Sequence, residues 1–344
     1  MTTTLATPTA SQAQVTPERI MQMAWGYAAP LILEAAIRHR VFDVLDNGPM
    51  SPGELANATG VSPRGLAAIV NVLVGFNFLA KDPHDNISLT AESSAFLVST
   101  KPGFFGGLIR HTSEHLLPKW LNLNEVVVTG KPVRAVNQES EGGDFFHEFV
   151  ADIFPMSYPP AQALAAHLDL RNGDSARVLD LAAGSGVWGI ALAQSAEQAT
   201  VTAVDWPEVI DVTKKTVARF GLSDRYTFVE GDLSAADFGT GHNVATLGHI
   251  LHSEGERRSK DLLAKTFAAL APGGTIAIQE FLVNADRTGP LNGLIFAVNM
   301  LVNTDEGDTY SFEEISSWLL EAGFTNSRTL SAPGPSPLIL ATRP

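Results

Sequence analysis

The stretch Val178-Leu179-Asp180-Leu181-Ala182-Ala183-Gly184-Ser185-Gly186 determines the expected fold. Its apolar first half is typical of a buried strand, and its glycines allow a tight turn into a following helix. Gly184 and Gly186 would also let a ligand approach the backbone closely. The stretch therefore predicts a strand–loop–helix unit that binds a ligand at its loop.

Short apolar runs alternate with helical patterns throughout the second half of the chain. The expected strands are residues 176–182, 200–204, 226–230, 244–247 and 275–280. The expected helices between them include 188–196, 208–220 and 256–270. Such alternation is typical of an α/β fold, a parallel sheet with helices on both faces. The last apolar segments, 325–330 and 337–342, predict a hairpin added at the sheet edge.

The first hundred residues have a different, largely helical pattern. Residues 1–15 are rich in Thr, Ala and Gln and are expected to be a disordered tail; they lack the basic start and apolar core of a secretory signal. Two helices are expected to begin at the capping box of Ser51 and Glu54 and at Ser62-Pro63. Two short strands with a turn between them are expected over 78–89. Residues 16–100 therefore predict a winged helix.

A winged helix either binds DNA or serves as a dimerisation module. The expected recognition helix, which starts at Arg64, carries one cation and is otherwise largely apolar. The whole chain has 23 Lys and Arg against 37 Asp and Glu, a net charge of −14. Because phosphate binding needs clustered cations, the charge argues against nucleic acid and anionic membrane partners. We therefore expect a dimerisation domain, with a DNA-binding regulator as the alternative.

The composition is that of a folded protein, with 45% hydrophobic and 17% charged residues among 344. The chain has no cysteine, which excludes disulfides, thiolate metal sites and a cysteine nucleophile. Charges or glycines interrupt the apolar runs before they reach the length of a transmembrane helix. The expected location is therefore the cytoplasm.

Carboxylates are expected at three successive strand ends, at Asp180, Asp205 and Asp232. Ligands of open α/β sheets bind at these ends, where Asp205 would accept hydrogen bonds from ribose hydroxyls and Asp232 from the adenine amine. The loop does not fit the dinucleotide fingerprint, because Ala182 stands at its first glycine. Since Asp180 would repel a pyrophosphate and attract a cation, the sequence favours S-adenosylmethionine over NAD.

Together these motifs resemble the S-adenosylmethionine-dependent O-methyltransferases of the plant caffeate/flavonoid and bacterial polyketide-tailoring type. The resemblance rests on residues 180–186, 205–210, 230–232 and 251–252, and it covers nearly the whole folded chain. It implies a Rossmann-like class I methyltransferase sheet over 171–344 that binds S-adenosyl-L-methionine. It further implies a helical linker and pocket cover over 101–170, a homodimer formed through the N-terminal domain, and a small aromatic acceptor.

The resemblance also implies a catalytic group. His252 matches the general base and Glu280 the acid that orients it; a second orienting acid of the family falls on Thr309, with Asp308 beside it. Ionising a phenol of pKa near 10 at pH 7 costs about 4 kcal/mol. A positioned histidine that removes the proton during attack typically contributes about 10²–10⁴-fold.

The sequence departs from the family pattern around the expected base. Ser253-Glu254 stands where the family has Asp-Trp, and Gly248 replaces a basic residue. Ser253 has a structural interpretation, as the start of a capping box with Glu256. These departures leave open a relative with altered chemistry, either N- or C-methylation or a reaction without methyl transfer.

The remaining candidate residues follow from the resemblance and from position. The cofactor-binding candidates are Asp180, Ala182, Gly184, Gly186, Asp205, Trp206, Asp232, Leu233 and Gly248. The acceptor-binding candidates, each with a place in the core or on the surface as the alternative, are Trp120, Phe149, Met156, His249, Asn299, Met300 and Asn303. His111 and His115 are spaced like a metal pair, but no third ligand is evident, and we expect no metal.

Overall fold

The computed structural model describes residues 15–136, 139–170 and 176–344. Contacts divide the chain into two compact units, Met1–Ser93 and Ser94–Pro344. Of the expected disordered tail, residues 1–14 lie outside the described residues. The helical segment that the sequence separates as 101–170 groups with the sheet in the second unit.

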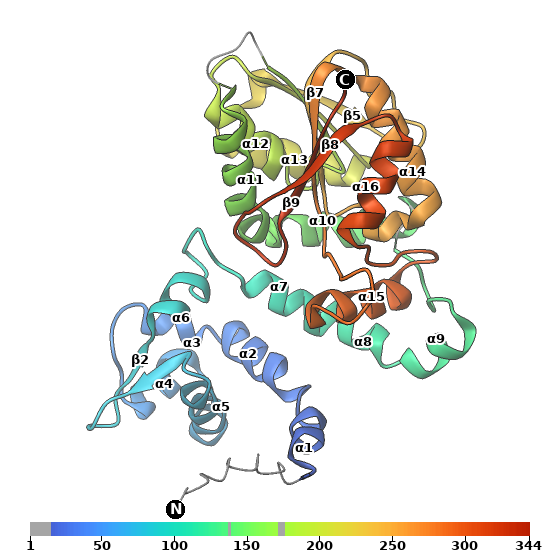
Figure 1. Ribbon diagram of the computed structural model, residues 1–344. Coiled ribbons are helices and arrows are strands. Elements are labelled where there is room, and N and C mark those ends of the chain that lie inside the picture. Colours follow the sequence, from blue (N-terminus) through green and yellow to red (C-terminus); the bar gives the residue numbers. More distant parts are fainter. Residues whose placement is uncertain (1–14, 137–138, 171–175) are drawn as a thin grey trace, which may run out of the picture. The chain divides into compact units, whose positions relative to one another are not determined.

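The first unit contains short helices and one two-stranded antiparallel sheet (Figure 1). Its elements are α1 (Glu18–Ala24), α2 (Ala28–Arg38), α3 (Val41–Leu45), α4 (Pro52–Thr59), α5 (Pro63–Gly75), β1 (Leu79–Lys81), β2 (Ile87–Leu89) and the start of α6 (Ala91–Phe96). The predicted capping box is confirmed, since the Glu54 N–H donates to Ser51 Oγ and the Ser51 N–H to the Glu54 carboxylate. The helices and the strand pair fall where the sequence predicts them, and the winged-helix assignment stays a prediction.

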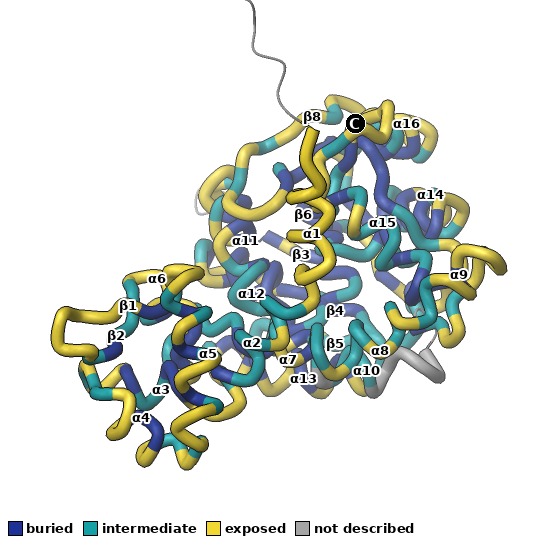
Figure 2. The backbone as a smooth tube through the Cα atoms, turned by 90° about the horizontal axis from the view of Figure 1, so that it is seen from below, coloured by how far each residue is buried: buried dark blue, intermediate teal, exposed yellow. Residues whose placement is uncertain are grey.

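The N-terminal helices expose an apolar surface. Every residue of α1 is exposed (yellow in Figure 2), including Met21 and Met23. Counted as one helix, Glu18–Arg38 is long and apolar enough to cross a membrane, which differs from the sequence-based expectation that no run reaches that length. Within its unit, α2 packs against α3 and α5, as a helix of a folded domain does.

The second unit is built on a seven-stranded sheet with the order β5-β4-β3-β6-β7-β9-β8. Its strands are β3 (Arg177–Leu181), β4 (Thr200–Asp205), β5 (Tyr226–Glu230), β6 (His242–Gly248), β7 (Leu270–Gln279), β8 (Thr325–Leu330) and β9 (Leu338–Thr342). The first five are parallel, and β9 runs antiparallel to both β7 and β8. The predicted parallel sheet with an edge hairpin is therefore confirmed.

Helices cover both faces of this sheet (Figure 1). The helices of this unit are α7 (Gly106–His111), α8 (Leu117–Trp120), α9 (Leu123–Thr129), α10 (Glu139–Asp152), α11 (Phe154–Leu168), α12 (Val187–Ser195), α13 (Pro207–Arg219), α14 (Leu251–Ala269), α15 (Leu291–Asn303) and α16 (Phe312–Glu321). Residues of α11, α12 and α13 pack in one core and residues of α14 and α16 in the other. Successive residues of β3 face opposite cores: Val178 belongs to the cluster that contains α11 and α12 residues, and Leu179 to the cluster that contains α14 and α16 residues. Because β3 to β7 run parallel between these two cores, their carboxyl ends lie at the same edge of the sheet.

Candidate active site

The loop between β3 and α12 has left-handed backbone positions and is held by hydrogen bonds to neighbouring elements. Ala182, Gly184 and Gly186 are left-handed, with φ of 50°, 56° and 76°. The Gly184 N–H donates to Asp205 Oδ2 at 2.8 Å, and the Thr213 hydroxyl donates to the Gly184 carbonyl at 2.6 Å. The loop is thereby tied to the end of β4 and to α13. It is the strand–loop–helix unit that the sequence predicts.

Asp205 stands at the next strand end, beside this loop. Its Oδ1 accepts the N–H of Trp206, the residue before α13, at 2.8 Å. Burial raises the pKa of Asp205 to about 6, against the opposing hydrogen bonds from Gly184 and Trp206. At neutral pH the carboxylate is mostly ionised and can accept further hydrogen bonds, as the predicted ribose contact requires.

Asp180 lies below the loop. Its side chain is fully buried, with Oδ1 accepting the Thr246 hydroxyl at 2.7 Å and Oδ2 the Gly189 N–H at 3.0 Å. Burial raises the pKa of Asp180 to about 7, although both hydrogen bonds oppose that shift. The expected direct attraction of a cation does not fit this placement, because no surface of the carboxylate is open. Asp180 instead joins β3, β6 and the first turn of α12.

Asp232 follows β5 at the third strand end. Its Oδ1 accepts the Ser234 N–H at 2.9 Å, and its Oδ2 lies 3.4 Å from Arg258 Nη2. Burial would raise the pKa of Asp232, but the hydrogen bonds of Ser234 and the charge of Arg258 outweigh it and lower that pKa. Asp232 is therefore an ionised acceptor. Its neighbour Leu233 belongs to the hydrophobic core.

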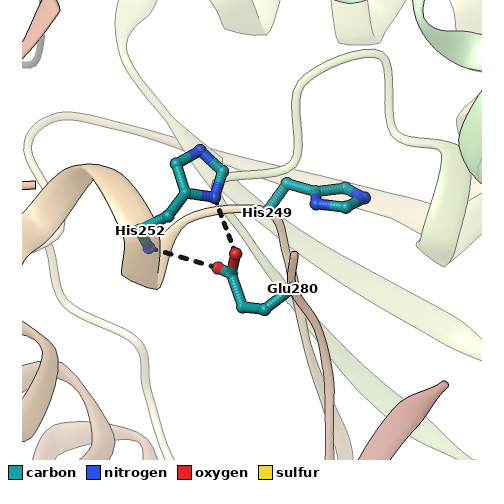
Figure 3. Close-up of side chains that lie close together, drawn as sticks. All are labelled: His249, His252 and Glu280. Atoms are coloured by element: carbon teal, nitrogen blue, oxygen red, sulfur yellow. Dashed lines mark hydrogen bonds and ion pairs between the residues drawn. The ribbon is translucent and has the colours of Figure 1, made fainter. Parts of the chain in front are cut away.

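His252 and Glu280 form a buried pair (Figure 3). His252 Nδ1 lies 2.6 Å from Glu280 Oε2. Burial would raise the pKa of Glu280, but the charge and hydrogen bond of His252 outweigh burial and lower it. Because the carboxylate only accepts, Nδ1 carries a proton, and in the neutral ring Nε2 therefore keeps its lone pair. The predicted base and its orienting acid are thus brought together, with Nε2 available as a proton acceptor.

The same carboxylate caps the start of α14. Glu280 Oε1 accepts the N–H of Leu251 at 2.7 Å and that of His252 at 3.3 Å. The predicted capping box of Ser253 and Glu256 is wrong, because Gly255 between them has a non-helical backbone, with φ 75° and ψ 166°. The Ser253 hydroxyl donates to the Ile250 carbonyl at 2.9 Å, and the regular part of α14 follows Gly255, where the sequence predicts the helix 256–270.

Three rings, those of Phe281, Phe296 and His249, lie around the candidate base. Phe281 stacks on Phe296 at 4.0 Å between ring centroids, Phe296 meets His252 edge-on at 4.9 Å, and His249 lies 4.8 Å from Phe281. The sequence analysis missed both phenylalanines. Phe281 directly follows Glu280, and Phe296 lies one turn before the candidate Asn299, so position on the expected elements could have indicated them.

His249 directly follows β6 with a left-handed backbone, φ 62°. Both of its ring nitrogens are buried and make no hydrogen bond within the described residues. Burial lowers the pKa of His249 to about 4, so the ring is neutral. One ligand atom each from His249, His252 and Glu280 lie within 4.8 Å of one another, a spacing that could hold a metal ion. Such an ion would have to replace the hydrogen bond between His252 and Glu280.

The acceptor candidates on α15 form a polar network with α8. Trp120 Nε1 donates to Asn299 Oδ1 at 3.0 Å, and Asn303 Nδ2 donates to the Asn299 carbonyl at 2.8 Å. Met300 on the same helix is buried. These residues share the face of α15 that carries Phe296, so the predicted acceptor helix contacts the ring cluster around His252.

Phe149 and Met156 lie on α10 and α11, half-buried. Phe149 stacks on His111 at 4.0 Å, and the His111 ring lies 5.1 Å from that of His115. Burial, followed by the charges of His115 and Lys119, lowers the pKa of His111 to about 4. No third ligand joins this histidine pair in the part of the chain that the structure describes, and the pair packs among aromatic rings.

The other predicted residues lie as follows. The main chain of Asp308 donates to the His252 carbonyl at 2.9 Å, while its carboxylate accepts the Thr309 N–H at 2.7 Å. Among the described residues, the ring of His252 therefore has a carboxylate partner in Glu280 and none in Asp308. Gly248 ends β6 against the indole of Trp188, a residue to which the sequence analysis gave no role.

Comparisons with known proteins agree with this geometry. One family model, the O-methyltransferase domain, matches residues 161–325, and another, the O-methyltransferase dimerisation domain, matches residues 21–99. The 3-hydroxy-5-methyl-1-naphthoate 3-O-methyltransferase of Streptomyces sahachiroi is 28% identical over 95% of either chain. The tetracenomycin polyketide synthesis 8-O-methyltransferase TcmO of Streptomyces glaucescens is also 28% identical, over 95% of this chain and 97% of the relative. The solved structure of a candidate O-methyltransferase from Nostoc punctiforme matches with a TM-score of 0.87 at 27% identity, over 96% of this chain and 100% of that one.

Proposed function

Because the chain belongs to the S-adenosylmethionine-dependent O-methyltransferase family, we propose that it methylates a hydroxyl of a small aromatic acceptor with His252 as the general base. The two Streptomyces relatives are named for a hydroxynaphthoate and for polyketide synthesis, which supports a phenolic acceptor here. The observation that carries the proposal is the 2.6 Å contact between His252 Nδ1 and Glu280 Oε2.

The residues at the rim of the sheet suit a nucleoside sulfonium. The ionised acceptors Asp205 and Asp232 and the flanking Trp206, beside the glycine loop of Gly184 and Gly186, together offer partners for a ribose and an adenine. When bound, S-adenosylmethionine supplies a methyl group activated by positive charge on sulfur.

The catalytic step assigned to this chain is a proton transfer. The acceptor hydroxyl would donate a hydrogen bond to His252 Nε2, and its proton would move to that nitrogen as the oxygen bonds to the methyl group and the carbon–sulfur bond breaks, which leaves the neutral thioether of S-adenosylhomocysteine. Glu280 then stabilises the imidazolium, since it already accepts the Nδ1 hydrogen bond. Holding the oxygen in line with the methyl group supplies a larger share, up to about 7–11 kcal/mol.

The rings of Phe281 and Phe296 give the acceptor an aromatic surface next to the base. A flat acceptor can pack on such rings in an offset or edge-to-face arrangement. The buried Met300 adds an adaptable apolar contact, and the amides of Asn299 and Asn303 offer polar ones.

The dimerisation-domain match supports a homodimer. We propose that α1 and the start of α2 take part in it, because Met21, Met23, Trp25, Tyr27 and Leu31 are large apolar side chains left exposed there. A cytoplasmic location, with neither nucleic acid nor membrane as partner, is proposed from the net charge of −14.

Incubation with methyl-labelled cofactor and a panel of phenols tests the reaction. We expect label transfer by the wild-type chain, a product heavier by one methyl group, and a loss of at least about 100-fold in His252→Ala. His39→Ala, on the exposed end of the first unit's helix α2, is the matched histidine control and should keep full activity. Full activity of His252→Ala, or a product with another mass gain, would reject the assignment.

A further inference from the structure

The indole of Trp188 occupies the space that a side chain at position 248 would need. Trp188 is the second residue of α12 and is 4% exposed. A Cβ atom at Gly248 would lie 2.1 Å from Trp188 Nε1 and 2.8 Å from its Cδ1. A side chain at position 248 is therefore excluded while the indole keeps this position. The indole N–H instead lies over the backbone at the carboxyl end of β6.

The N–H of Trp188 has no partner among the residues that the structure describes. It makes no hydrogen bond to a described residue, and it is not enclosed as the ring nitrogens of His249 are. An indole N–H can only donate, and a donor on an otherwise buried ring is costly if nothing accepts from it. The structure thus presents a free donor at the rim where the cofactor is expected.

The surroundings of this donor favour an anionic acceptor. The N-terminus of α12 lies at the same loop and carries partial positive charge. The loop itself, residues 182–186, contains no Lys or Arg. The carboxylate oxygens of Asp180 are occupied by Thr246 and Gly189 beneath it. The loop therefore offers an anion neutral donors only.

We propose that the indole N–H of Trp188, left uncovered by Gly248, donates a hydrogen bond to the α-carboxylate of the cofactor's methionyl part. This inference rests on the proposed function, because it takes the ligand to be S-adenosylmethionine. The carboxylate is the anionic group of that ligand. A donor at the strand end beside the loop would hold it while the sulfonium faces the acceptor.

Two ligands distinguish a hydrogen bond to the carboxylate from a purely structural role of Trp188 in packing. S-Adenosylhomocysteine carries the carboxylate, whereas 5′-methylthioadenosine has the same nucleoside and thioether without the amino-acid part. In isothermal titration, Trp188→Phe keeps a ring of similar shape and removes the N–H. We expect its Kd for S-adenosylhomocysteine to rise about tenfold and its Kd for methylthioadenosine to stay within about twofold. Trp318→Phe, at a buried tryptophan of α16, is the matched control and should change neither.

Gly248→Ala gives a second, independent variant. Its methyl group must displace the indole, so the same selective loss of S-adenosylhomocysteine binding is expected. Circular dichroism melting checks that each variant is folded. An equal loss for both ligands, or no loss for S-adenosylhomocysteine in either folded variant, overturns the inference. If the wild-type chain binds neither ligand, the proposed function itself fails.

Discussion

Glu280 holds His252 at two points, with Oε2 2.6 Å from the ring Nδ1 and Oε1 3.3 Å from the main-chain nitrogen. One carboxylate thus sets both the tautomer of the ring and the start of α14. In Glu280→Gln, the amide NH₂ group would donate to Nδ1 and move the proton to Nε2, where it blocks the base. We expect kcat to fall by about 100-fold or more, with little change in the Kd of S-adenosylhomocysteine.

Initial rates at saturating cofactor, combined with titration calorimetry, check this prediction. Glu256→Gln is the matched control, because Glu256 lies on the same helix with its side chain 62% exposed. A Glu280→Gln enzyme with normal kcat would show that the pair is structural.

Asp205 makes cofactor binding depend on pH. Burial raises its pKa to about 6, so protonation below that pH removes the acceptor that the ribose needs. The Kd of S-adenosylhomocysteine should rise by up to about tenfold per pH unit below pH 6. Titrations between pH 5 and pH 8 measure this slope. Asp205→Asn should bind more weakly at pH 8 and show a flat profile, and a flat wild-type profile would contradict the assignment.

The same shift has a consequence for stability. The folded pKa of Asp205 exceeds the unfolded value of about 3.9, so its stabilising contribution is present below pH 4 and is lost as pH rises through 6. Asp205→Asn should therefore become more stable relative to the wild type between pH 4 and pH 7. Urea unfolding at several pH values measures the difference, and a constant difference would refute the raised pKa.

The sequence predicts those parts of the fold that depend on local pattern. The apolar runs at 226–230 and 325–330 coincide with β5 and β8, and the edge hairpin follows from turn residues between two short runs. Beyond the non-helical Gly255, α14 lies where the sequence predicts the helix 256–270. The short helical turn 251–254 before Gly255 could not be predicted in this way, because its first N–H groups are capped by Glu280 from a distant strand.

In the candidate site, too, the sequence predicts which residues lie at the strand ends but not their tertiary contacts. Its motif places Asp180 at the correct strand end, but sequence does not reveal that its carboxylate is buried under the loop. The pairing of His252 with Glu280 was predictable, since both follow adjacent parallel strands. The fit between Trp188 and Gly248 was not, because it depends on the tilt of a side chain across two elements.

Asn299 links the acceptor helix to α8. Its Oδ1 accepts from Trp120 Nε1 at 3.0 Å and from Asn303 Nδ2 at 3.1 Å. Asn299→Ala leaves Trp120 Nε1 and Asn303 Nδ2 without this acceptor. The contact between α8 and α15 beside Phe296 then loses these hydrogen bonds. We expect the KM for the acceptor to rise about tenfold, with the Kd for the cofactor unchanged. Steady-state kinetics with varied acceptor measure this, and a raised KM for cofactor alone would contradict the placement.

Charge on the exposed apolar face of α1 should weaken the homodimer. In Met23→Glu combined with Ile20→Glu, two side chains that are 73% and 72% exposed become charged and would be desolvated in an interface. Light scattering after size-exclusion chromatography should show a shift from dimer to monomer. Leu320→Glu, at a 69% exposed position on α16, is the control and should leave the dimer intact. Dimers in all three proteins would exclude α1 from the interface.

Gly307 lets the segment after α15 approach the candidate base. A Cβ there would lie 2.5 Å from the His252 carbonyl oxygen, which accepts the Asp308 N–H at 2.9 Å. Because the same Cβ would lie 2.3 Å from Thr304 Oγ1, Gly307→Ala must shift its own segment or displace Thr304 and the backbone of His252, and we expect a loss of about 1–3 kcal/mol in unfolding free energy together with a lower kcat.

Gly53→Ala is the matched control, because nothing lies within 4 Å of a Cβ at that position on α4. It should be neutral or stabilising by up to about 1 kcal/mol, since alanine restricts the unfolded chain. Urea unfolding and initial rates compare the two variants. If Gly307→Ala kept the wild-type kcat despite lower stability, the backbone position of His252 would not limit the reaction.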